Sequence, residues 1–325
     1  GRAHTMENQP WSPERDGIMI RSANSMLMAF LERPNNILST IPFIVLKAEW
    51  GRTSVPYNWR LMRQRFEAAG ETGNEWVYTE LVRLYELWVD VAGTRVDSYA
   101  TDQDILVDAY LDGADLYVIV NNLEFEETTF DLDLGGLGGA NLPSVDIRHP
   151  HTDSGDPVLD VSSVAELPEV ITLGGEATMV IRVELDAVVT IGETSTETKH
   201  YASSMLQSIG ANTTLSFDVD GLTPGANGEA ILRLGVGRAH GLSLTPTVTV
   251  NGTAVTVPSD YRGYDQFHNG NGRDEFFGVL EIPVPWAAIQ ASNQIDVTFP
   301  ENGGHVSSIA LQIFNQSSAI VRRTK

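Results

Sequence analysis

The residues best placed to contact a ligand follow directly after a buried apolar segment. Residues 41–46 form a continuous apolar run, which is typical of a parallel strand covered on both faces. Lys47, Glu49 and Trp50 come next. At such a strand end an indole can stack on an apolar ring face, while the amine or the carboxylate hydrogen-bonds hydroxyl groups. The alternative is structural, with Trp50 packed beneath the loop and Lys47 paired with Glu49.

A second group of candidate residues lies in the polar N-terminal loop. His4, Glu7 and Asn8 occur within a few residues of one another and are candidates to line a binding cleft. The competing interpretation is an ordinary solvated loop. Glu7 is also a candidate nucleophilic carboxylate, although its place inside a loop rather than at a strand end argues against that role.

The sequence lacks the residues and motifs that several other kinds of site require. The chain has no cysteine, which excludes disulfides, thiolate metal ligands and cysteine nucleophiles. The sequence contains no glycine-rich phosphate loop, HExxH zinc motif or GxSxG elbow. Residues 260–274 are rich in side-chain oxygens, but their spacing does not match an EF-hand and favours a solvated loop. We therefore expect no cofactor and no metal site.

The charge of the chain narrows the classes of partner. Asp and Glu number 43 against 21 Lys and Arg, which gives a formal net charge of -22 over 325 residues. Such a chain repels phosphate backbones and anionic lipid surfaces at long range, so we expect no nucleic-acid and no membrane partner. No apolar run approaches the roughly 20 residues that span a bilayer. Neutral or weakly charged ligands fit best.

The first 94 residues are predicted to alternate helix, strand and helix. Ser12 is a suitable N-cap with a proline after it, and apolar residues at helical spacing follow until Pro34. A short helix is predicted over 58–69, and a longer one after Asn74. The apolar stripe of that longer helix comprises Val77, Leu81, Leu84, Trp88 and Val91, with Gly93 as its C-cap.

Short alternating segments replace helices after residue 95. Their spacing predicts one β-sandwich over 95–187 and a second over 188–325. Asn251-Gly252 is the strongest hairpin signal in the chain. Trp286, which comes after Pro283 and Pro285, is either an aromatic on a ligand-binding face or a core residue, and a lone aromatic between strands favours the core.

The predicted parallel strand at 41–46 cannot satisfy its backbone groups alone. A parallel strand needs a neighbour to accept and donate its hydrogen bonds. The simplest source of that neighbour is a longer parent chain, in which residues 1–94 are the last two βα units of a barrel or an open α/β sheet.

Five segments of the chain resemble glycoside hydrolase family 86, the β-agarases and β-porphyranases. These segments are SPERD at 12–16, SANSMLMAFLERP at 22–34, IPFI at 41–44 with KAEWG at 47–51, LWVDVAGTRVD at 87–97 and LYVIVNNL at 116–123. The match is close over about the first 125 residues and holds in outline beyond them.

The resemblance implies α/β plus all-β architecture, with the C-terminal part of a (β/α)₈ TIM barrel (1–94) followed by two β-sandwich domains (95–187 and 188–325). The second sandwich is then carbohydrate-binding-like. The resemblance also places the chain just after the segment that holds the nucleophilic glutamate, with the acid/base glutamate earlier still. Retaining chemistry needs two carboxylates about 5–5.5 Å apart. We therefore expect no catalytic residue in this chain.

The resemblance implies an endo-acting retaining hydrolase of red-algal galactan that cleaves β-1,4 linkages of agarose. Its partners would be an agar-type galactan polysaccharide or oligosaccharide and the missing N-terminal part of the barrel. The substrate-binding residues would be Lys47, Glu49 and Trp50, together with His4, Glu7 and Asn8. An extracellular, secreted location is expected. The alternative from another class is a non-catalytic carbohydrate-binding or adhesion protein built on the two sandwiches.

Overall fold

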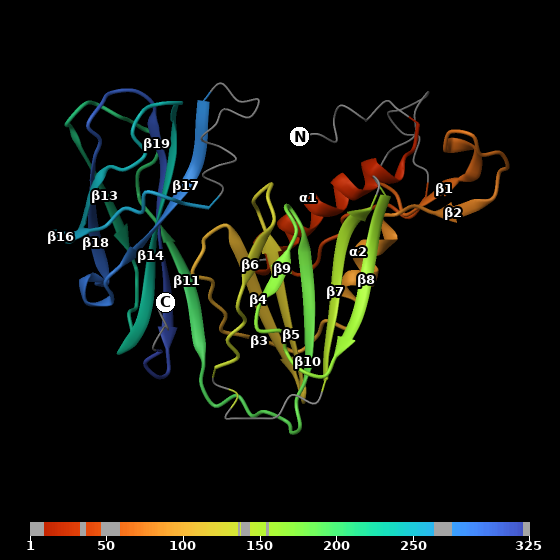
Figure 1. Ribbon diagram of the computed structural model, residues 1–325. Coiled ribbons are helices and arrows are strands. Elements are labelled where there is room, and N and C mark those ends of the chain that lie inside the picture. The colour runs from red at the N-terminus through yellow and green to blue at the C-terminus, as the bar shows by residue number, and fades with distance from the viewer. Residues whose placement is uncertain are drawn as a thin grey trace. The chain divides into compact units, whose positions relative to one another are not determined.

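The chain divides into two compact units, each described here by itself. The first comprises residues 1–100 and 105–189, and the second comprises residues 101–104 and 190–325. The computed structural model describes residues 10–32, 37–46, 59–135, 137, 144–153, 156–262 and 275–320 (Figure 1). Among these, no helix is long and apolar enough to cross a membrane.

The first unit is built on a six-stranded antiparallel sheet with the order β3-β4-β5-β10-β7-β8. Its strands are β3 (Thr94–Val96), β4 (Ile105–Asp112), β5 (Asp115–Asn122), β7 (Ser144–Asp153), β8 (Asp156–Val164) and β10 (Thr178–Glu184). A second, two-stranded sheet pairs β6 (Thr128–Phe130) with β9 (Ile171–Leu173). The apolar core between these layers includes Val118, Val145, Leu173 and Ile181. This layered all-β architecture confirms the sandwich predicted for this part of the chain.

Two helices cover the other face of the six-stranded sheet (Figure 1). Helix α1 (Pro13–Leu31) contributes Met28, and α2 (Val82–Trp88) contributes Leu87, which is fully buried against Ile119 and Val180. Helices and sheet thus form one compact unit. This unit contains residues on both sides of the predicted division at 94/95, and that division stays a prediction. The break between the two compact units lies at 189/190.

The helix predicted over 58–69 is wrong for the described residues of that segment. Residues Met62–Gln64 form β1, which pairs with β2 (Trp76–Tyr78), and Arg65–Glu67 form a short 3-10 helix. The backbone N–H groups of Leu61 and Met62 donate to the carbonyls of Ile44 and Val45, at 2.8 and 3.0 Å. These tertiary hydrogen bonds override a helical propensity that is weak in a segment this short.

The predicted longer helix after Asn74 is also shorter than expected. Val77 belongs to β2, and the helical stripe begins only at Leu81, the N-cap of α2. Gly93 does not cap this helix, because α2 ends at Trp88. Instead Gly93 has a φ of 106°, and a Cβ there would lie 2.3 Å from the Leu111 carbonyl oxygen. The glycine is therefore needed where the chain enters the sheet.

The apolar run at 41–46 forms one parallel pairing among the described residues. Ile44 bridges Arg60 in parallel orientation. However, only Phe43 is buried in this run, and Ile41 is 85% exposed. Among the residues that the structure describes, the run is therefore not covered on both faces.

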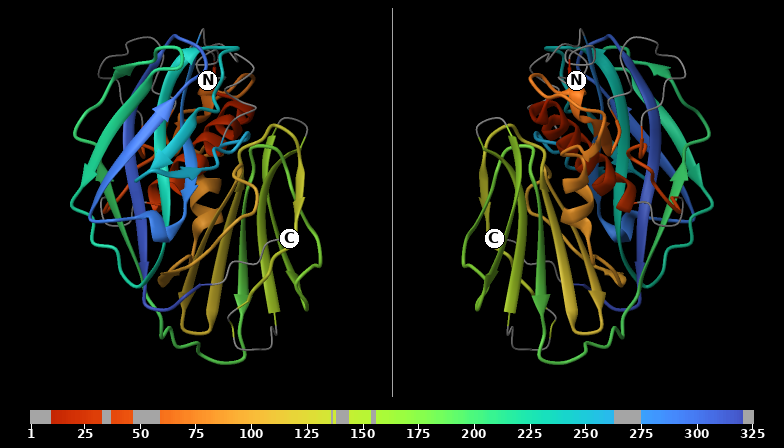
Figure 2. Two further views of the ribbon diagram at one scale, coloured as in Figure 1. Left: turned by 90° about the vertical axis from the view of Figure 1, so that its left-hand side faces the viewer. Right: turned by 90° about the vertical axis from the view of Figure 1, so that its right-hand side faces the viewer.

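The second unit is a two-layered sandwich, as the alternating segments predicted (Figure 2). One sheet has the order β11-β19-β14-β17, with β12 on β19, and the other has the order β13-β18-β15-β16. The strands are β11 (Ser195–Tyr201), β12 (Gln207–Ser208), β13 (Thr214–Asp220), β14 (Asn227–Ala239), β15 (Thr247–Val250), β16 (Thr253–Val255), β17 (Glu275–Val284), β18 (Ser292–Thr298) and β19 (His305–Gln316). The core between the sheets includes Phe217, Leu232, Ile282 and Leu311.

The packing of α2 on the sheet gives a stability prediction. Leu87→Ala removes a fully buried side chain and leaves a cavity, so the free energy of unfolding should fall by about 2–5 kcal/mol. Val89→Ala is the matched control, because Val89 is the exposed C-cap residue of the same helix. This substitution should change the free energy of unfolding by less than about 0.5 kcal/mol. Urea unfolding of both variants measures the difference, and equal effects would contradict the packing of Leu87.

Candidate functional site

All six residues predicted to contact a ligand lie outside the described residues. These are His4, Glu7, Asn8, Lys47, Glu49 and Trp50. Their roles stay predictions, and the site is built here from the described residues that flank them.

The segment that leads into Lys47 ends in a short parallel ladder. The Ile44 N–H donates to the Trp59 carbonyl at 2.9 Å, and the Leu61 N–H donates to the Ile44 carbonyl at 2.8 Å, around the parallel bridge between Ile44 and Arg60. The segments at 43–46 and 59–62 therefore run side by side in the same direction. The described segment ends at Leu46, at the carboxyl end of this pair, which is the end where α/β folds place ligand contacts.

A buried carboxylate joins the segments that surround this ladder. Asp16 Oδ2 accepts hydrogen bonds from Trp11 Nε1 at 2.8 Å and from the Glu80 backbone N–H at 3.0 Å. Its other oxygen, Oδ1, lies 3.8 Å from Arg15 Nε. The carboxylate thus ties the loop before α1 and the residue just before α2 to the first turn of α1.

Local sequence explains why α1 begins here. Ser12 is the N-cap, and its Oγ accepts from the Arg15 N–H at 3.3 Å. Pro13 occupies the first helical position, where no intrahelical N–H is lost. Glu14 and Asp16 lie in the first turn, where the helix dipole favours negative charge.

Burial dominates the electrostatics of this cluster. It raises the pKa of Asp16 to about 7, against the opposing effects of the Trp11 hydrogen bond and the Arg15 charge. Burial also lowers the pKa of Arg15, and it lowers the pKa of Arg60 to about 10, with the Arg15 charge adding to that decrease. Arg60 pairs in turn with Glu67.

Trp11 connects this cluster to the β1–β2 hairpin. The Arg63 guanidinium carbon lies 4.0 Å from the centroid of the Trp11 ring, in a cation–π contact. Arg63 also donates to Glu71 at 2.7 Å. One indole therefore donates from its edge to Asp16 and stacks its face on Arg63.

The pKa of Asp16 would suit a general acid, but a ligand could not reach its carboxylate. Its side chain is fully buried, and both hydrogen bonds to Oδ2 come from groups that build the fold. We assign it a positioning role. Sequence reasoning missed this carboxylate, and the signal available was an acidic residue on the fourth position of a proline-started helix, five residues after a tryptophan.

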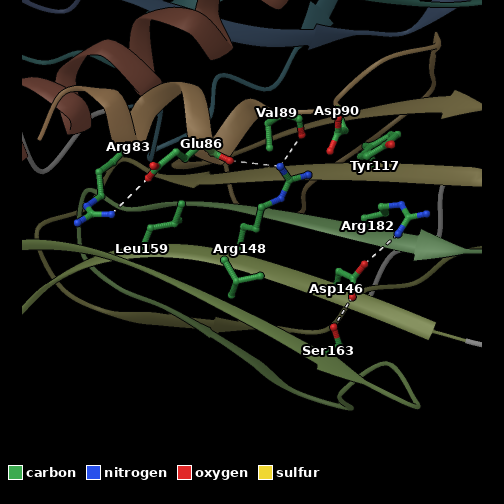
Figure 3. Close-up of a pocket in the computed structure, with 11 residues that line it drawn as sticks. Arg83, Glu86, Val89, Asp90, Tyr117, Asp146, Arg148, Leu159, Ser163 and Arg182 are labelled. Carbon is green, nitrogen blue, oxygen red and sulfur yellow. Dashed lines mark hydrogen bonds and ion pairs between the residues drawn. The ribbon is translucent and has the colours of Figure 1, made fainter. Parts of the chain in front are cut away.

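An open pocket of about 720 Å³ lies on the helix-covered face of the sheet, where α2 ends (Figure 3). It is lined by Arg83, Glu86, Val89, Asp90, Tyr117, Asp146, Arg148, Leu159, Val161, Ser163 and Arg182. In Figure 3 the Arg148 side chain reaches from the sheet toward the end of the helix.

Arg148 caps helix α2. Its Nη1 donates to the Glu86 carbonyl at 3.3 Å and to the Val89 carbonyl. These are carbonyls that the helix itself leaves without partners. Burial lowers the pKa of Arg148, while the nearby Asp90 charge opposes that decrease.

Two of the three acidic groups that line the pocket, Asp146 and Glu86, are also paired, and Asp90 is the third. Asp146 accepts from Ser163 at 2.5 Å and from Arg182 at 2.9 Å, and the serine hydrogen bond is the largest cause of its lowered pKa. Arg182 also pairs with Asp115 at 2.9 Å. Glu86 pairs with Arg83 at 3.3 Å. These pairs connect strands and stabilise the helix, so the pocket lacks the two available carboxylates that glycoside hydrolysis needs.

The remaining candidates have structural roles or lie elsewhere. Trp286 is half-buried at the border of the core of the second unit, and its Nε1 donates to the Gly225 carbonyl at 3.3 Å, which favours the core interpretation. Most of the oxygen-rich loop, at 263–274, lies outside the described residues. Among the residues the structure describes, no group of three or more His, Asp or Glu side chains could hold a metal ion.

The raised pKa of Asp16 gives a pH prediction. Between its unfolded pKa of about 4 and its folded pKa of about 7, the folded state binds one more proton than the unfolded state. This group's contribution to stability is therefore fully present below pH 4 and is lost as the pH rises to 7. Asp16→Asn retains an acceptor for Trp11 and Glu80 but does not titrate.

The measurement is the free energy of unfolding of wild type and Asp16→Asn from pH 4 to 8. The wild-type value minus the variant value should fall between pH 4 and 7 and level off above. Asp218→Asn, which removes an exposed carboxylate on β13, is the control. A difference that is constant with pH would show that Asp16 titrates normally.

Two family models match the chain. The porphyranase β-sandwich domain 1 model matches residues 104–207, and the beta porphyranase A C-terminal model matches residues 216–314. The first range covers strands β4 to β11, and the second covers most of the second unit.

Similar proteins match the chain over nearly all of its length. A funoran endo-beta-hydrolase from Wenyingzhuangia aestuarii is 44% identical over 323 residues, which cover 98% of this chain and 43% of that protein. The crystal structure of BuGH86 in complex with neoagarooctaose is 42% identical with a TM-score of 0.90, and the match covers 98% of this chain and 51% of that one. BpGH86A, a β-porphyranase from the human gut bacterium Bacteroides plebeius, is 30% identical with a TM-score of 0.84, over 96% of this chain and 55% of that one.

The coverage is asymmetric. The chain is matched almost completely, yet it spans about half the length of these relatives. The part that it matches is their C-terminal portion.

Proposed function

The chain belongs to glycoside hydrolase family 86, and we propose that it is the C-terminal portion of an endo-acting hydrolase of red-algal galactans. One observation carries this proposal. The chain shares 42% of its residues and a TM-score of 0.90, over 98% of its length, with an enzyme whose crystal structure contains neoagarooctaose. Other similar proteins are named as a funoran endo-beta-hydrolase, a beta-agarase and a beta-porphyranase.

Residues 1–94 would contribute the last part of a (β/α)₈ barrel. Two features support this assignment: the parallel pairing of 43–46 with 59–62, and the packing of α1 and α2 outside it. Leu38, Ile41 and Val45 are exposed aliphatic side chains beside this pairing. A preceding segment of the barrel would cover them, since contiguous exposed apolar surface marks a docking site.

The chemistry would then depend on two carboxylates from that preceding segment. In a retaining glycosidase one carboxylate attacks the anomeric carbon and the other protonates the leaving oxygen, then activates the water that hydrolyses the glycosyl-enzyme. This chain would supply the edge of the cleft. Lys47 and Glu49 would hydrogen-bond hydroxyl groups, and Trp50 would stack on a sugar ring, with the loop of His4, Glu7 and Asn8 beside them.

Agarose is the substrate that we propose within the galactans. It is the neutral polymer of the three, and a chain with a net charge of -22 repels sulfated galactans at long range. The neoagarooctaose complex of the similar structure also favours it. Because the substrate is an algal cell-wall polymer, we further propose that the protein is secreted.

One prediction of this proposal concerns activity without the preceding segment. The 325-residue chain alone should release no reducing ends from agarose, porphyran or funoran, because it lacks the carboxylate pair. The same chain joined to its preceding segment should hydrolyse agarose faster than the two sulfated polymers. Release by the chain alone would refute the proposed division and would identify Glu7 as the residue to substitute next.

Another prediction of this proposal concerns the contribution of Trp50 to oligosaccharide binding. Trp50→Ala in the complete protein should weaken oligosaccharide binding by about tenfold, since truncating an aromatic anchor removes on the order of 1.4 kcal/mol or more. Calorimetry measures the affinity, and thermal unfolding checks the fold. Unchanged affinity with a lowered melting temperature would instead identify Trp50 as a packing residue.

A further inference from the structure

The β1–β2 hairpin exposes two aromatic rings on one of its faces. Trp76 is 41% exposed and Tyr78 is 64% exposed. Because side chains alternate along a strand, residues two apart point to the same face, with Cα atoms about 7 Å apart. Their cross-strand partners are Gln64 and Met62. The hairpin therefore presents two neighbouring rings on the face that carries the even-numbered residues.

The opposite face of the hairpin anchors it. Arg63 pairs in register with Val77, stacks on Trp11 and donates to Glu71. Arg63 is buried, and its contacts do not involve either exposed ring. The contacts of Arg63 therefore anchor the strand that carries Trp76 and Tyr78, and the two aromatic side chains take no part in those contacts.

The hairpin continues from the proposed substrate edge. The Met62 N–H donates to the Val45 carbonyl at 3.0 Å, so β1 extends past the carboxyl end of the segment at 43–46. Lys47, Glu49 and Trp50 follow the same end in sequence. The hairpin therefore begins beside the end of the described segment that precedes these residues in the sequence.

The composition of the exposed face indicates its occupant. The surface that a protein segment would cover in this unit is aliphatic, with Leu38, Ile41 and Val45 exposed. The hairpin face differs, because it combines two aromatic rings with the polar Gln64, and exposed Asn74 and Glu75 directly precede Trp76. Rigid aromatic rings among polar groups suit a ligand with both apolar faces and hydroxyls.

We propose that Trp76 and Tyr78 form an aromatic platform that binds a neutral galactan chain outside the cleaved linkage. The rings would contact the C–H faces of two sugar units, with Gln64 within reach of their hydroxyls. This inference rests on the proposed function, because it takes the galactan as the ligand. It adds a binding surface that belongs wholly to the described part of this chain.

The test is retardation in native gels that contain soluble agarose, with the complete protein. Trp76→Ala, Tyr78→Ala and the double variant are compared with wild type, and gels with hydroxyethyl cellulose provide the blank. The double variant should raise the apparent dissociation constant for agarose by about tenfold. Trp76→Phe should retain most of the retardation, since it keeps an aromatic face.

The matched control is Tyr201→Ala. Tyr201 is 65% exposed, nearly as much as Tyr78, but it lies on β11 in the second unit. Its substitution should leave retardation unchanged. Equal migration of wild type and the double variant would overturn the platform. Protection of Trp76 from acrylamide quenching in the sugar-free complete protein would also overturn it, because it would show that protein covers the face.

The platform and the proposed function can fail separately. Retardation does not require hydrolysis, and reducing-end release by wild type is measured in parallel. Loss of retardation in the double variant, with no hydrolysis by wild type, would support the platform and refute the enzyme. Hydrolysis by wild type with full retardation of the double variant would support the enzyme and refute the platform.

Discussion

The arrangement of the first unit depends on the hydrogen bonds to one buried carboxylate. Asp16 accepts from Trp11 and from the backbone of Glu80, and so joins the start of α1 to the start of α2. The helices then share a second link, from Trp88 Nε1 to Asn24 Oδ1 at 2.8 Å, before their apolar faces meet the sheet. Because the same Trp11 ring supports Arg63, the carboxylate also sets the position of the hairpin. Removing a partner from a buried polar group costs more than the bond itself contributes.

The features that sequence predicted best are those set by local chemistry. Asn251 and Gly252 have φ values of 51° and 77°, as a type I′ hairpin requires, and β15 and β16 flank them. Ser12-Pro13 likewise begins α1 where expected. The helix predicted over 58–69 failed because its backbone groups pair with a segment about 16 residues earlier. Alternating polarity does not predict strand β8, because β8 lies at the edge of the sheet and its middle residues are exposed.

Paired charge explains why the pocket at the end of α2 is a poor site for catalysis. Arg148, Arg182 and Asp146 all have partners that belong to the fold. The shifted pKa values in this unit also come from the fold, because burial is the largest cause for Asp16 and Arg148, and the Ser163 hydrogen bond is the largest cause for Asp146. Perturbation marks a functional site only where a ligand can reach the group. Sequence could not reveal this distinction, since exposure depends on which segments pack together.

The acidity of the chain determines what kind of contact can hold a polymer. A net charge of -22 provides no attraction for sulfate groups, and long-range charge effects weaken further with salt. Binding must then come from short-range contacts, which are dispersion and apolar burial on ring faces together with hydrogen bonds to hydroxyls. Such contacts act only where rings are held rigidly and exposed. The β1–β2 hairpin meets both conditions, because Arg63 and Trp11 fix one face and leave Trp76 and Tyr78 on the other.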